Sequence, residues 1–340
     1  MVKIDNSQRI PLYKQIIRAI KNKIKNGEYR EGEKLPSINK LQRELSVSRN
    51  TIIKAYDKLI SRGIIRSISG KGYYVFKDSY QIEHNIFLLF DLFLPYKEKL
   101  YSSFMDNIGE NATVDIYFHH YDKELYKKII RGALGQYTDY VIMPLDSDQD
   151  LMNWFDNIFE DEKVYILDLG INEYGRRYPS VCQNFRKEWY ECLTEVENQI
   201  KQYDRIILKH RALYSKSKQP HDKEMIAGFS EFCRDKNIKY KIVDKKGELE
   251  VNKNECYFVT DDDDLVKTIK NAIAKNYKLG EDMGIISHNE TPLKSIACLH
   301  GVTTITTDFN EMGRNMAEMI KHNKNEHIEN PSKLILRDSI

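Results

Sequence analysis

The stretch from Leu35 to Val75 constrains the fold of this chain more than any other, because it predicts two short helices and a hairpin with few residues between them. Ser48 suits the N-cap of a helix, since its hydroxyl can accept hydrogen bonds from free backbone amides, and Gly63 suits the end of that helix. Between them, apolar residues recur at helical spacing: Ile52, Ala55, Tyr56, Leu59 and Ile60. Ser37 can cap a helix just upstream, and two helices joined so closely predict a helix-turn-helix.

A β-hairpin is predicted directly after these helices. Residues 64–68 and 73–76 are rich in β-branched and aromatic side chains, and they flank Ser69-Gly70-Lys71-Gly72, a glycine-containing turn with a cation at its tip. This hairpin adds a wing to the helix-turn-helix. The alternative is a small helical fold with a solvated basic surface, but the ordered combination of the pieces favours the winged helix-turn-helix.

The first turn of the helix after Ser48 carries Arg49, Asn50 and Thr51. Side chains of these types bind phosphates and base edges in the major groove of DNA. Lys71 in the wing suits contacts with the DNA backbone or the minor groove. The sequence therefore predicts a surface that contacts DNA.

Further motifs lie in a fixed order around this stretch. Residues 11–27 predict an amphipathic first helix, with a proline at its start and a glycine at its end. The motifs are Pro-Leu-Tyr-x-Gln-Ile from residue 11, Gly-Glu-Lys-Leu-Pro-Ser at 32–37, Val-Ser-Arg-x-Thr at 47–51, Ala-Tyr-x-x-Leu at 55–59 and Gly-x-Gly-Tyr at 70–73. In this order they resemble the winged-helix domain of GntR-family transcription regulators, over about residues 8–76.

The resemblance implies DNA contacts from the start of the second helix of the helix-turn-helix and from the wing tip. One position departs from the family: Asn39 stands where the family often has an arginine, so that Lys40 or Arg43 would supply this contact. The predicted DNA-binding residues are Ser37, Asn39, Lys40, Arg43, Ser48, Arg49, Asn50, Thr51, Lys54, Gly70, Lys71 and Gly72.

Charge is distributed unevenly along the chain. Residues 1–80 contain 18 Lys and Arg against 7 Asp and Glu, a net charge of +11, whereas the rest of the chain contains 35 against 44, a net charge of −9. The total of +2 therefore conceals a basic head and an acidic body. This asymmetry is typical of a DNA-binding module attached to a domain that does not bind DNA.

From Asn85 onward, short apolar runs alternate with amphipathic helices. Such runs, separated by helices, predict parallel strands that are covered on both faces. Strands are expected at 86–90, 114–118, 140–144, 164–168, 180–182, 205–209, 240–243, 257–260 and 284–287, and helices at about 97–110, 123–135, 186–202, 221–236 and 263–276. So many strands predict two doubly wound lobes with a ligand cleft at the carboxyl ends of the strands.

The predicted fold class is α/β, with an N-terminal winged helix-turn-helix and a two-lobed, doubly wound parallel-sheet domain of the periplasmic-binding-protein type. We expect the winged domain over residues 1–77, a polar linker over 78–84, and an effector-binding and dimerisation domain over 85–340. No run approaches the about 20 apolar residues of a membrane span, and no signal-peptide pattern opens the chain. We therefore expect a cytoplasmic protein without a membrane partner.

The last third of the chain carries a second set of motifs. They are Val259-Thr260-Asp261-Asp262, Leu279-Gly280-Glu281-Asp282-Met283-Gly284, Thr303-Thr304-Ile305 and Met312-Gly313. Their order resembles the C-terminal half of the LacI-type effector domain, which is similar to periplasmic sugar-binding proteins. The resemblance spans roughly residues 85–337 and implies a carbohydrate effector bound between two lobes.

Two positions depart from the LacI-type pattern of ligand contacts. Asn289 stands where an aspartate usually holds sugar hydroxyls, and Met225 stands where the family has an arginine. Other candidates follow strand ends or lie in the loop near residue 211, because carboxylates, amides and aromatic rings bind sugars. The predicted ligand-binding residues are Asp91, Phe93, Asp146, Asp168, Asn184, Arg211, Tyr214, His221, Asp261 and Asn289, with Gln183 as a further candidate. For each of them, a turn-forming or capping role is the alternative.

The sequence predicts no catalytic residues, no metal site and no cofactor, since phosphate-binding loops, nucleophile elbows and zinc-binding helices are not found in it. The acidic run 261–264 is better explained by capping of the helix that follows than by a metal site.

We therefore predict a homodimeric transcription regulator that binds double-stranded operator DNA and responds to a small carbohydrate effector. A repressor is the form that the resemblance implies. Two alternatives stay open: the body is an aminotransferase-like enzyme, or it only dimerises.

Overall fold

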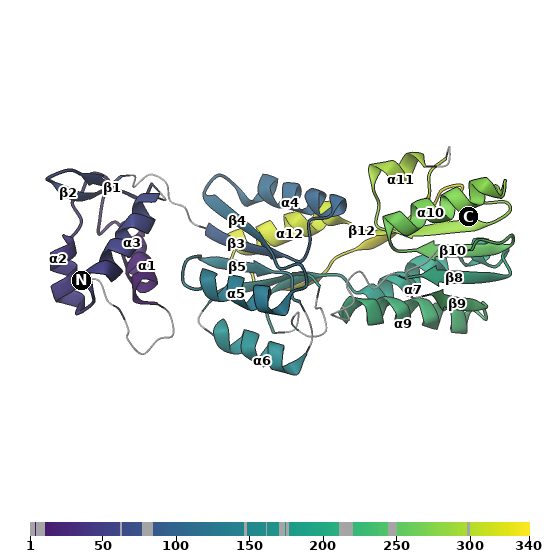
Figure 1. Cartoon of the computed structure of the whole chain (residues 1–340), viewed down its shortest axis with the longest axis horizontal. Helices are drawn as coiled ribbons and strands as arrows, with labels where there is room; N and C mark the ends of the chain where they lie inside the picture. The colour runs from purple at the N-terminus through teal and green to yellow at the C-terminus, as the bar shows by residue number, and fades with distance from the viewer. Residues whose placement is uncertain are drawn as a thin grey trace.

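The computed structural model describes Ile4 and residues 11–61, 63–76, 84–145, 148–160, 162–169, 174, 177–210, 220–243, 250–297 and 300–340, apart from the side chains of residues 25, 61, 220 and 221. A small winged helix at the N-terminal end is followed by two α/β lobes (Figure 1). In these residues, no helix has the length and apolar character needed to cross a lipid bilayer.

The N-terminal part is the predicted winged helix-turn-helix. It consists of α1 (Leu12–Lys25), α2 (Ile38–Leu45), α3 (Arg49–Ser61), β1 (Ile65–Ile68) and β2 (Gly72–Val75). The two strands pair antiparallel, and Gly63, with φ of +66°, ends α3 in the left-handed region that favours glycine. Ile16, Leu41, Ile52 and Leu59 lie fully buried in one core that unites the three helices with the hairpin.

The N-terminal lobe contains a six-stranded parallel sheet in the order β13-β7-β6-β5-β3-β4. Its strands are β3 (His84–Phe90), β4 (Ala112–Phe118), β5 (Asp139–Ile142), β6 (Val164–Asp168), β7 (Ser180–Cys182) and β13 (His327–Glu329). Its helices are α4 (Pro95–Ile108), α5 (Lys123–Ala133), α6 (Gln149–Ile158) and α12 (Phe309–Lys321). Helices α4 and α12 cover one face, and α5 and α6 cover the other (Figure 1).

The C-terminal lobe contains a second six-stranded sheet in the order β14-β12-β11-β10-β8-β9, which is parallel except for the antiparallel strand β14. Its strands are β8 (Arg205–Lys209), β9 (Tyr240–Val243), β10 (Glu255–Val259), β11 (Gly284–His288), β12 (Thr303–Thr307) and β14 (Ser332–Ile335). Its helices are α7 (Phe185–Glu195), α8 (Glu197–Ile200), α9 (Pro220–Asp235), α10 (Asp262–Ala274) and α11 (Pro292–Ile296). Helices α7 and α9 share one core on one face of this sheet, and α10 packs on the other face.

These sheets confirm the predicted fold class, and they add elements that the sequence did not predict. The additional elements are α6, α11, α12, β12, β13 and β14. Val196 divides the helix that we expected over 186–202 into α7 and α8. His84, which we assigned to the linker, begins β3: it pairs with Ala112, and its Nδ1 lies 2.9 Å from Asp139 Oδ2. The end of the winged domain, which we expect at residue 77, falls outside the described residues.

The chain passes between the two lobes three times, and one residue joins all three passages. They lie after β7, between β12 and α12, and between β13 and β14. Asn330, in the third passage, is almost fully buried, and its backbone N–H donates to Cys182 O at 2.8 Å. Its side-chain amide donates to Thr307 Oγ1 at 2.7 Å and to Asp308 O at 3.0 Å. Asn330 therefore ties the three passages together through its backbone and its side chain.

The winged helix contacts the N-terminal lobe through α1. Lys14 is buried, and its ammonium donates to Gly132 O at 2.8 Å, in the last turn of α5. The last carbonyls of a helix lack partners within the helix and carry partial negative charge, so they suit a cation. Burial, followed by the charge of Lys54, lowers the pKa of Lys14 to about 8.

The joint can be tested with Asn330→Ala, which removes two buried hydrogen bonds. We expect the free energy of unfolding to fall by about 1–3 kcal/mol, because the buried partners lose their donor. Urea unfolding followed by circular dichroism measures the change. Asn153→Ala, on the exposed side of α6, is the control and is expected to change stability by no more than about 0.5 kcal/mol. Equal stability of the two variants would contradict this role of Asn330.

Candidate functional site

The N-terminus of α3 presents polar side chains to solvent. Ser48 caps the helix as predicted, since its Oγ accepts from Thr51 N at 3.2 Å and lies 2.8 Å from Thr51 Oγ1. These two hydroxyls are thus engaged in capping. Arg49 and Asn50 are exposed, and within the described part of the chain their side chains have no hydrogen-bond or ion-pair partner. They are therefore available for a ligand that approaches the helix end.

The predicted DNA-binding residues of α2 likewise consist of one capping residue and several exposed residues. Ser37 caps α2, with its Oγ accepting from Lys40 N at 3.2 Å. Asn39, Lys40 and Arg43 are exposed. The guanidinium of Arg43 donates to Asn39 O at 3.3 Å, which holds it near the position where the family often has an arginine. This surface can thus present a cation although residue 39 is an asparagine.

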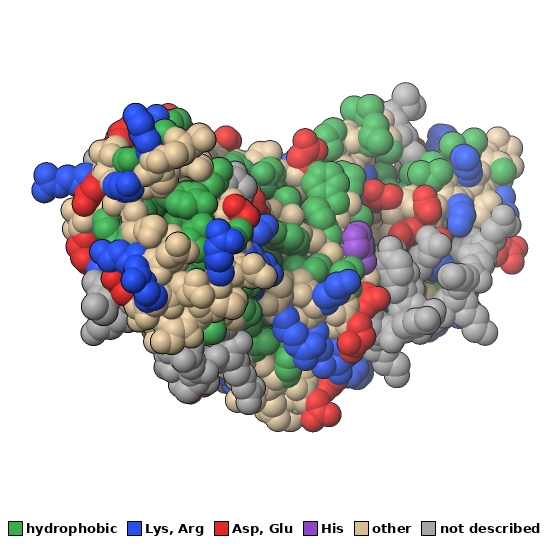
Figure 2. All heavy atoms as spheres, turned by 60° about the vertical axis from the view of Figure 1, so that its left-hand side comes forward, with side chains coloured by type: hydrophobic (Ala, Val, Ile, Leu, Met, Phe, Trp, Pro, Cys, Tyr) green, Lys and Arg blue, Asp and Glu red, His purple; other side chains and the backbone are tan. Residues whose placement is uncertain are grey.

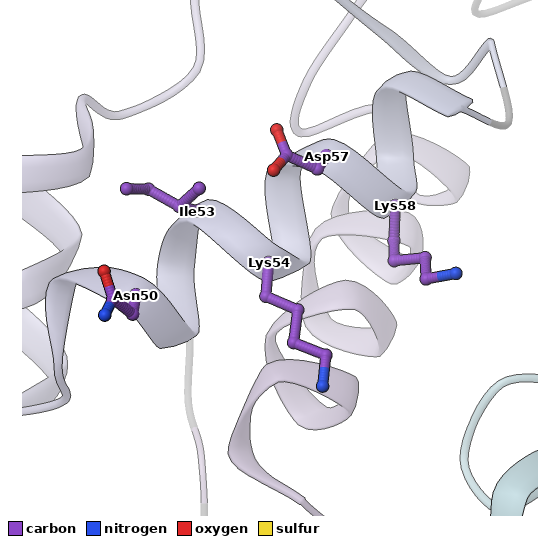
Figure 3. Close-up of a pocket in the computed structure, with 5 residues that line it drawn as sticks. All are labelled: Asn50, Ile53, Lys54, Asp57 and Lys58. Carbon is purple, nitrogen blue, oxygen red and sulfur yellow. The ribbon is translucent and has the colours of Figure 1, made fainter.

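Farther along α3, Lys54 and Lys58 project side by side (Figure 3). They border a groove of about 410 Å³ that is lined by Asn50, Ile53, Lys54, Asp57 and Lys58. The Lys54 ammonium lies 4.2 Å from the centre of the Tyr13 ring, a cation–π contact between α3 and α1.

The wing tip completes this basic surface. Gly70 has φ of +72° and Gly72 has φ of +112°, values that a side chain would strain, so the tight turn requires glycine there. Lys71 stands between them and is exposed. Figure 2, which turns this end of the molecule toward the viewer, shows several Lys and Arg side chains at the surface, with Asp and Glu side chains among them. Arg49, Lys54 and Lys71 together offer cations from a helix and a hairpin to a polyanion.

A cavity of about 180 Å³ lies between the two lobes at the carboxyl ends of their strands. This is the place that a doubly wound fold predicts for a ligand. It is lined by Asp91, Leu94, Pro95, Tyr96, Lys97, Tyr121, Asp168, Leu169, Gln183, Phe185, His210, Asp222, Met225, Thr260, Asp261, Asp262, His288, Asn289, Thr291 and Lys294. Both lobes contribute, so that any closure of the joint changes the shape of this cavity.

The N-terminal side of the cavity is built around a buried ammonium. Lys97, in the first turn of α4, forms an ion pair with Asp91, and its Nζ lies 3.7 Å from Asp168 Oδ2. Tyr121 OH donates to Asp91 Oδ2 at 2.6 Å. Burial alone would raise the pKa of Asp91, but the charge of Lys97 and the hydrogen bonds from Lys97 and Tyr121 hold it at about 2. Asp91 is therefore ionised at neutral pH.

Asp168 adopts an unusual backbone conformation at the end of β6. Its φ is +68°, in the left-handed region that non-glycine residues rarely adopt. The side-chain amide of Gln183 donates to Asp168 Oδ1, and the backbone N–H of Gln183 donates to Asp168 O at 2.9 Å. Gln183 is almost fully buried, and its Oε1 has no partner in the described structure.

The C-terminal side is built around a second ammonium. Lys294 donates to His288 O at 2.8 Å and to Asn289 O at 2.9 Å, and it lies 2.7 Å from Asp262 Oδ1. Asn289 has φ of +61°, is largely buried, and has an Oδ1 without a partner among the described residues. Nearby, His210 Nε2 lies 3.2 Å from Asp222 Oδ1.

Four of the predicted ligand residues line the cavity: Asp91, Asp168, Asp261 and Asn289. Asp261 also caps α10, since its Oδ1 accepts from Asp264 N at 3.1 Å. Met225 lines the cavity and is buried, so it contributes an apolar wall. Gln183 lines it as well.

Two predicted residues do not line it. Phe93 is 62 % exposed and packs edge-to-face on Phe118, at 5.9 Å between ring centres. Asn184 caps α7 and donates to Glu329 Oε2 at 3.1 Å, across the joint. Asp146, Arg211 and Tyr214 and the side chain of His221 lie outside the described part of the structure.

Several cavity residues were missed by sequence reasoning, above all Lys97, Tyr121, His210 and Lys294. A signal for Lys97 exists. It shares a helical stripe with Leu100, Phe104 and Ile108, all of which are buried. A lysine on the apolar stripe of an amphipathic helix indicates a buried charge with a partner.

The ion cluster can be tested with Lys97→Met. This variant leaves Asp91 and Asp168 buried without their cation, so we expect the free energy of unfolding to fall by about 3–5 kcal/mol. Lys99→Met, at an exposed position of the same helix, is expected to change it by no more than about 0.5 kcal/mol. Chemical denaturation measures both. A loss no larger than that of the control would show that Lys97 does not hold the carboxylates.

Two protein-family models match this chain. Residues 12–75 match the bacterial regulatory proteins of the gntR family, and residues 205–340 match the periplasmic binding protein-like domain.

Relatives with curated descriptions match the N-terminal part. The repressor YtrA of Bacillus subtilis is 37 % identical over 75 residues, which are 22 % of this chain and 58 % of that protein. MngR of Escherichia coli, the mannosyl-D-glycerate transport/metabolism system repressor, is 36 % identical over 100 residues, 29 % of this chain and 39 % of that protein. The chain spans less than two thirds of the length of each.

Solved structures match the two lobes. A dimeric Lac repressor has a TM-score of 0.62 at 13 % identity, with 75 % of this chain and 98 % of that chain covered. The transcription regulator CcpA of Lactococcus lactis has a TM-score of 0.58 at 14 % identity, with 75 % and 98 % covered. A probable maltose operon repressor of Staphylococcus aureus has a TM-score of 0.58 at 12 % identity, with 75 % and 97 % covered. These similarities confirm the predicted LacI-type body, and the alternative of an aminotransferase-like enzyme is wrong.

Proposed function

Because the chain joins a gntR-family winged helix to a periplasmic-binding-protein-like body, we propose that it is a transcription repressor whose operator affinity is controlled by a small carbohydrate. The observation that carries this proposal is the presence, in one chain, of an exposed basic winged helix and a buried polar cavity between two lobes. A repressor needs both, since one surface reads DNA and the other senses the effector.

The winged helix supports the DNA-binding part of the proposal. The start of α3 carries Arg49 and Asn50 with uncommitted side chains, and Lys71 extends from the wing. Arg and Asn read base edges in the major groove, and lysines neutralise phosphates. The net charge of +11 over residues 1–80 attracts the DNA backbone over a longer range.

The body supports a homodimer. Leu293 and Ile296, on α11, are 76 % and 70 % exposed, and Val266, on the neighbouring α10, is 49 % exposed. Figure 2 shows hydrophobic side chains exposed at the top of the C-terminal lobe, where Figure 1 places α11. Helix α4, with the exposed Met105, lies on the same side of the molecule as α11 (Figure 1). A second copy related by a twofold axis would cover this apolar surface and place two winged helices on a near-palindromic operator.

The cavity supports effector control. A ligand that binds both lobes favours one arrangement of the joint over others, and it then changes DNA affinity by its differential affinity for the two arrangements. The names of two similar proteins, the mannosyl-D-glycerate repressor and the probable maltose operon repressor, concern carbohydrates. A body that only dimerises remains the second candidate, and a rise in melting temperature with a ligand would count against it.

The DNA-binding part is tested with Arg49→Ala. We expect operator binding to weaken by about 1–3 kcal/mol at fixed salt, because a direct base or phosphate contact is lost. Fluorescence anisotropy with an operator selected from genomic DNA measures the affinity. Lys278→Ala, at an exposed position of the body, is the control and should leave it unchanged. Equal operator affinity of the Arg49 variant and the control would contradict the assignment of α3 as the recognition helix.

The dimer is tested with Leu293→Glu, which places a charge in the apolar surface of α11. We expect the sedimentation coefficient to shift from dimer to monomer at micromolar concentration, because burying an unpaired carboxylate opposes association. Lys278→Glu provides a carboxylate at an exposed site on the same lobe and should remain dimeric. A dimer that withstands Leu293→Glu would place the interface elsewhere.

A further inference from the structure

A second cavity, which we call the interdomain cavity, lies where the winged helix meets the N-terminal lobe. It has a volume of about 460 Å³ and is lined by residues of α1, such as Arg18, and by residues of the lobe, such as Asp139 and Lys163. Gly135, which follows α5, also lines it, so the cavity borders the contact of Lys14 with the last turn of α5. Its volume falls within the roughly 300–1,000 Å³ of sites for small molecules.

Both domains contribute cations to the described lining, which are Arg18, Lys21, Lys163 and Lys321. Two carboxylates accompany them, those of Asp139 and Glu162. Arg18 is exposed, and its guanidinium has no hydrogen-bond or ion-pair partner in the described part of the chain. The ammonium of Lys163 donates to a neutral group, Asn323 Oδ1, at 2.5 Å. An anion in the cavity would therefore meet, from each domain, one cation that no described carboxylate pairs with.

One buried oxygen of the lining lacks a donor. Asp139 is 1 % exposed, and its Oδ2 lies 2.9 Å from His84 Nδ1 and accepts from Thr138 Oγ1 at 2.6 Å. Its Oδ1 is buried and has no hydrogen-bond partner among the residues that the structure describes. Since a buried polar atom without a partner costs free energy, this oxygen calls for a donor such as a ligand hydroxyl.

An organic phosphate combines the two properties that this lining asks for. Its phosphate oxygens accept a bidentate pair of hydrogen bonds from a guanidinium, and further oxygens accept from ammonium groups that approach from other directions. A hydroxyl of the same molecule donates to the carboxylate. A single carboxylate ligand offers only two oxygens and one charge, so it would leave more of the cations without a partner.

We infer that the interdomain cavity is a second ligand site, which binds a small organic phosphate between the winged helix and the N-terminal lobe. Arg18 and Lys163 bind the phosphate, and a ligand hydroxyl donates to Asp139 Oδ1. Because the ligand contacts both domains, it favours the arrangement in which α1 is docked on α5, and it adds to the contact of Lys14. The site is separate from the cavity between the lobes, and its occupation does not depend on the proposed carbohydrate effector.

The ligand class is tested by calorimetry of the full-length protein at constant ionic strength. Inorganic pyrophosphate probes the anion site alone, and glycerol 3-phosphate provides a phosphate together with hydroxyls. We expect both to bind, whereas glycerol, which has no anionic group, should not. Citrate is the control for multivalent charge without phosphorus. Binding of neither phosphate probe overturns the inference, and so does citrate that binds as tightly as pyrophosphate.

The place of binding is tested with Arg18→Ala and Lys163→Ala, one from each domain. Both side chains are exposed, so neither change disturbs a core. We expect each variant to bind pyrophosphate about tenfold more weakly, because a charge-assisted hydrogen bond to the phosphate is lost. A loss in only one of the two variants would contradict a ligand that bridges the domains.

Three controls separate this site from a general effect of charge. Arg314→Ala and Lys128→Ala each remove an exposed cation of the same type outside the lining, and they should bind pyrophosphate as the unchanged protein does. Arg49→Ala removes an exposed cation at the start of α3 and should also leave the affinity unchanged. A loss in any of these controls as large as that of Arg18→Ala would place the anion elsewhere and overturn the inference.

Discussion

The joint between the lobes is the constraint on which the rest of the structure depends. Three chain passages cross it. Asn330, in the third, bonds to the first through its backbone N–H and to the second through its side-chain amide. The sheet of the N-terminal lobe includes β13, and the sheet of the C-terminal lobe includes β14. Both strands come from the last part of the chain, so neither sheet is complete without it. Hydrogen bonds tie the passages together, and Leu169, which follows β6 of the N-terminal lobe, also packs into the apolar core of the C-terminal lobe.

This construction explains the polarity of the cavity. Strands that end at the joint bring carboxylates such as those of Asp91 and Asp168 together, and both side chains are buried. The ammonium of Lys97 offsets the charge of Asp91 and Asp168, and the ammonium of Lys294 satisfies the carbonyls of the loop after β11. Both ammonium groups are thereby engaged, whereas Gln183 Oε1, Asn289 Oδ1 and His210 Nδ1 have no hydrogen-bond partner among the described residues.

Local signals made much of the fold predictable. Ser48 caps α3 through a hydrogen bond three residues away, and the alternation of apolar runs and helices requires no knowledge of distant contacts. The strand-end rule also placed Asp91 and Asp168 at the cavity. Lys97 escaped prediction because its partners come from other elements, and Phe93 was misplaced because alternation does not show that Phe118 lies beside it. Pairings across elements are set by tertiary packing, which one sequence pattern does not reveal.

The contact between α1 and α5 provides a path between the two ends of the molecule. Lys14 binds the last carbonyls of α5, and α5 packs on the sheet whose strand ends form the cavity. Tyr13, the neighbour of Lys14, lies under the Lys54 ammonium of α3. A shift of the N-terminal lobe that displaces the end of α5 must therefore either move α1 with it or break a buried ion–carbonyl contact. Either outcome changes how α3 is held, so the cavity and α3 belong to one connected set of contacts.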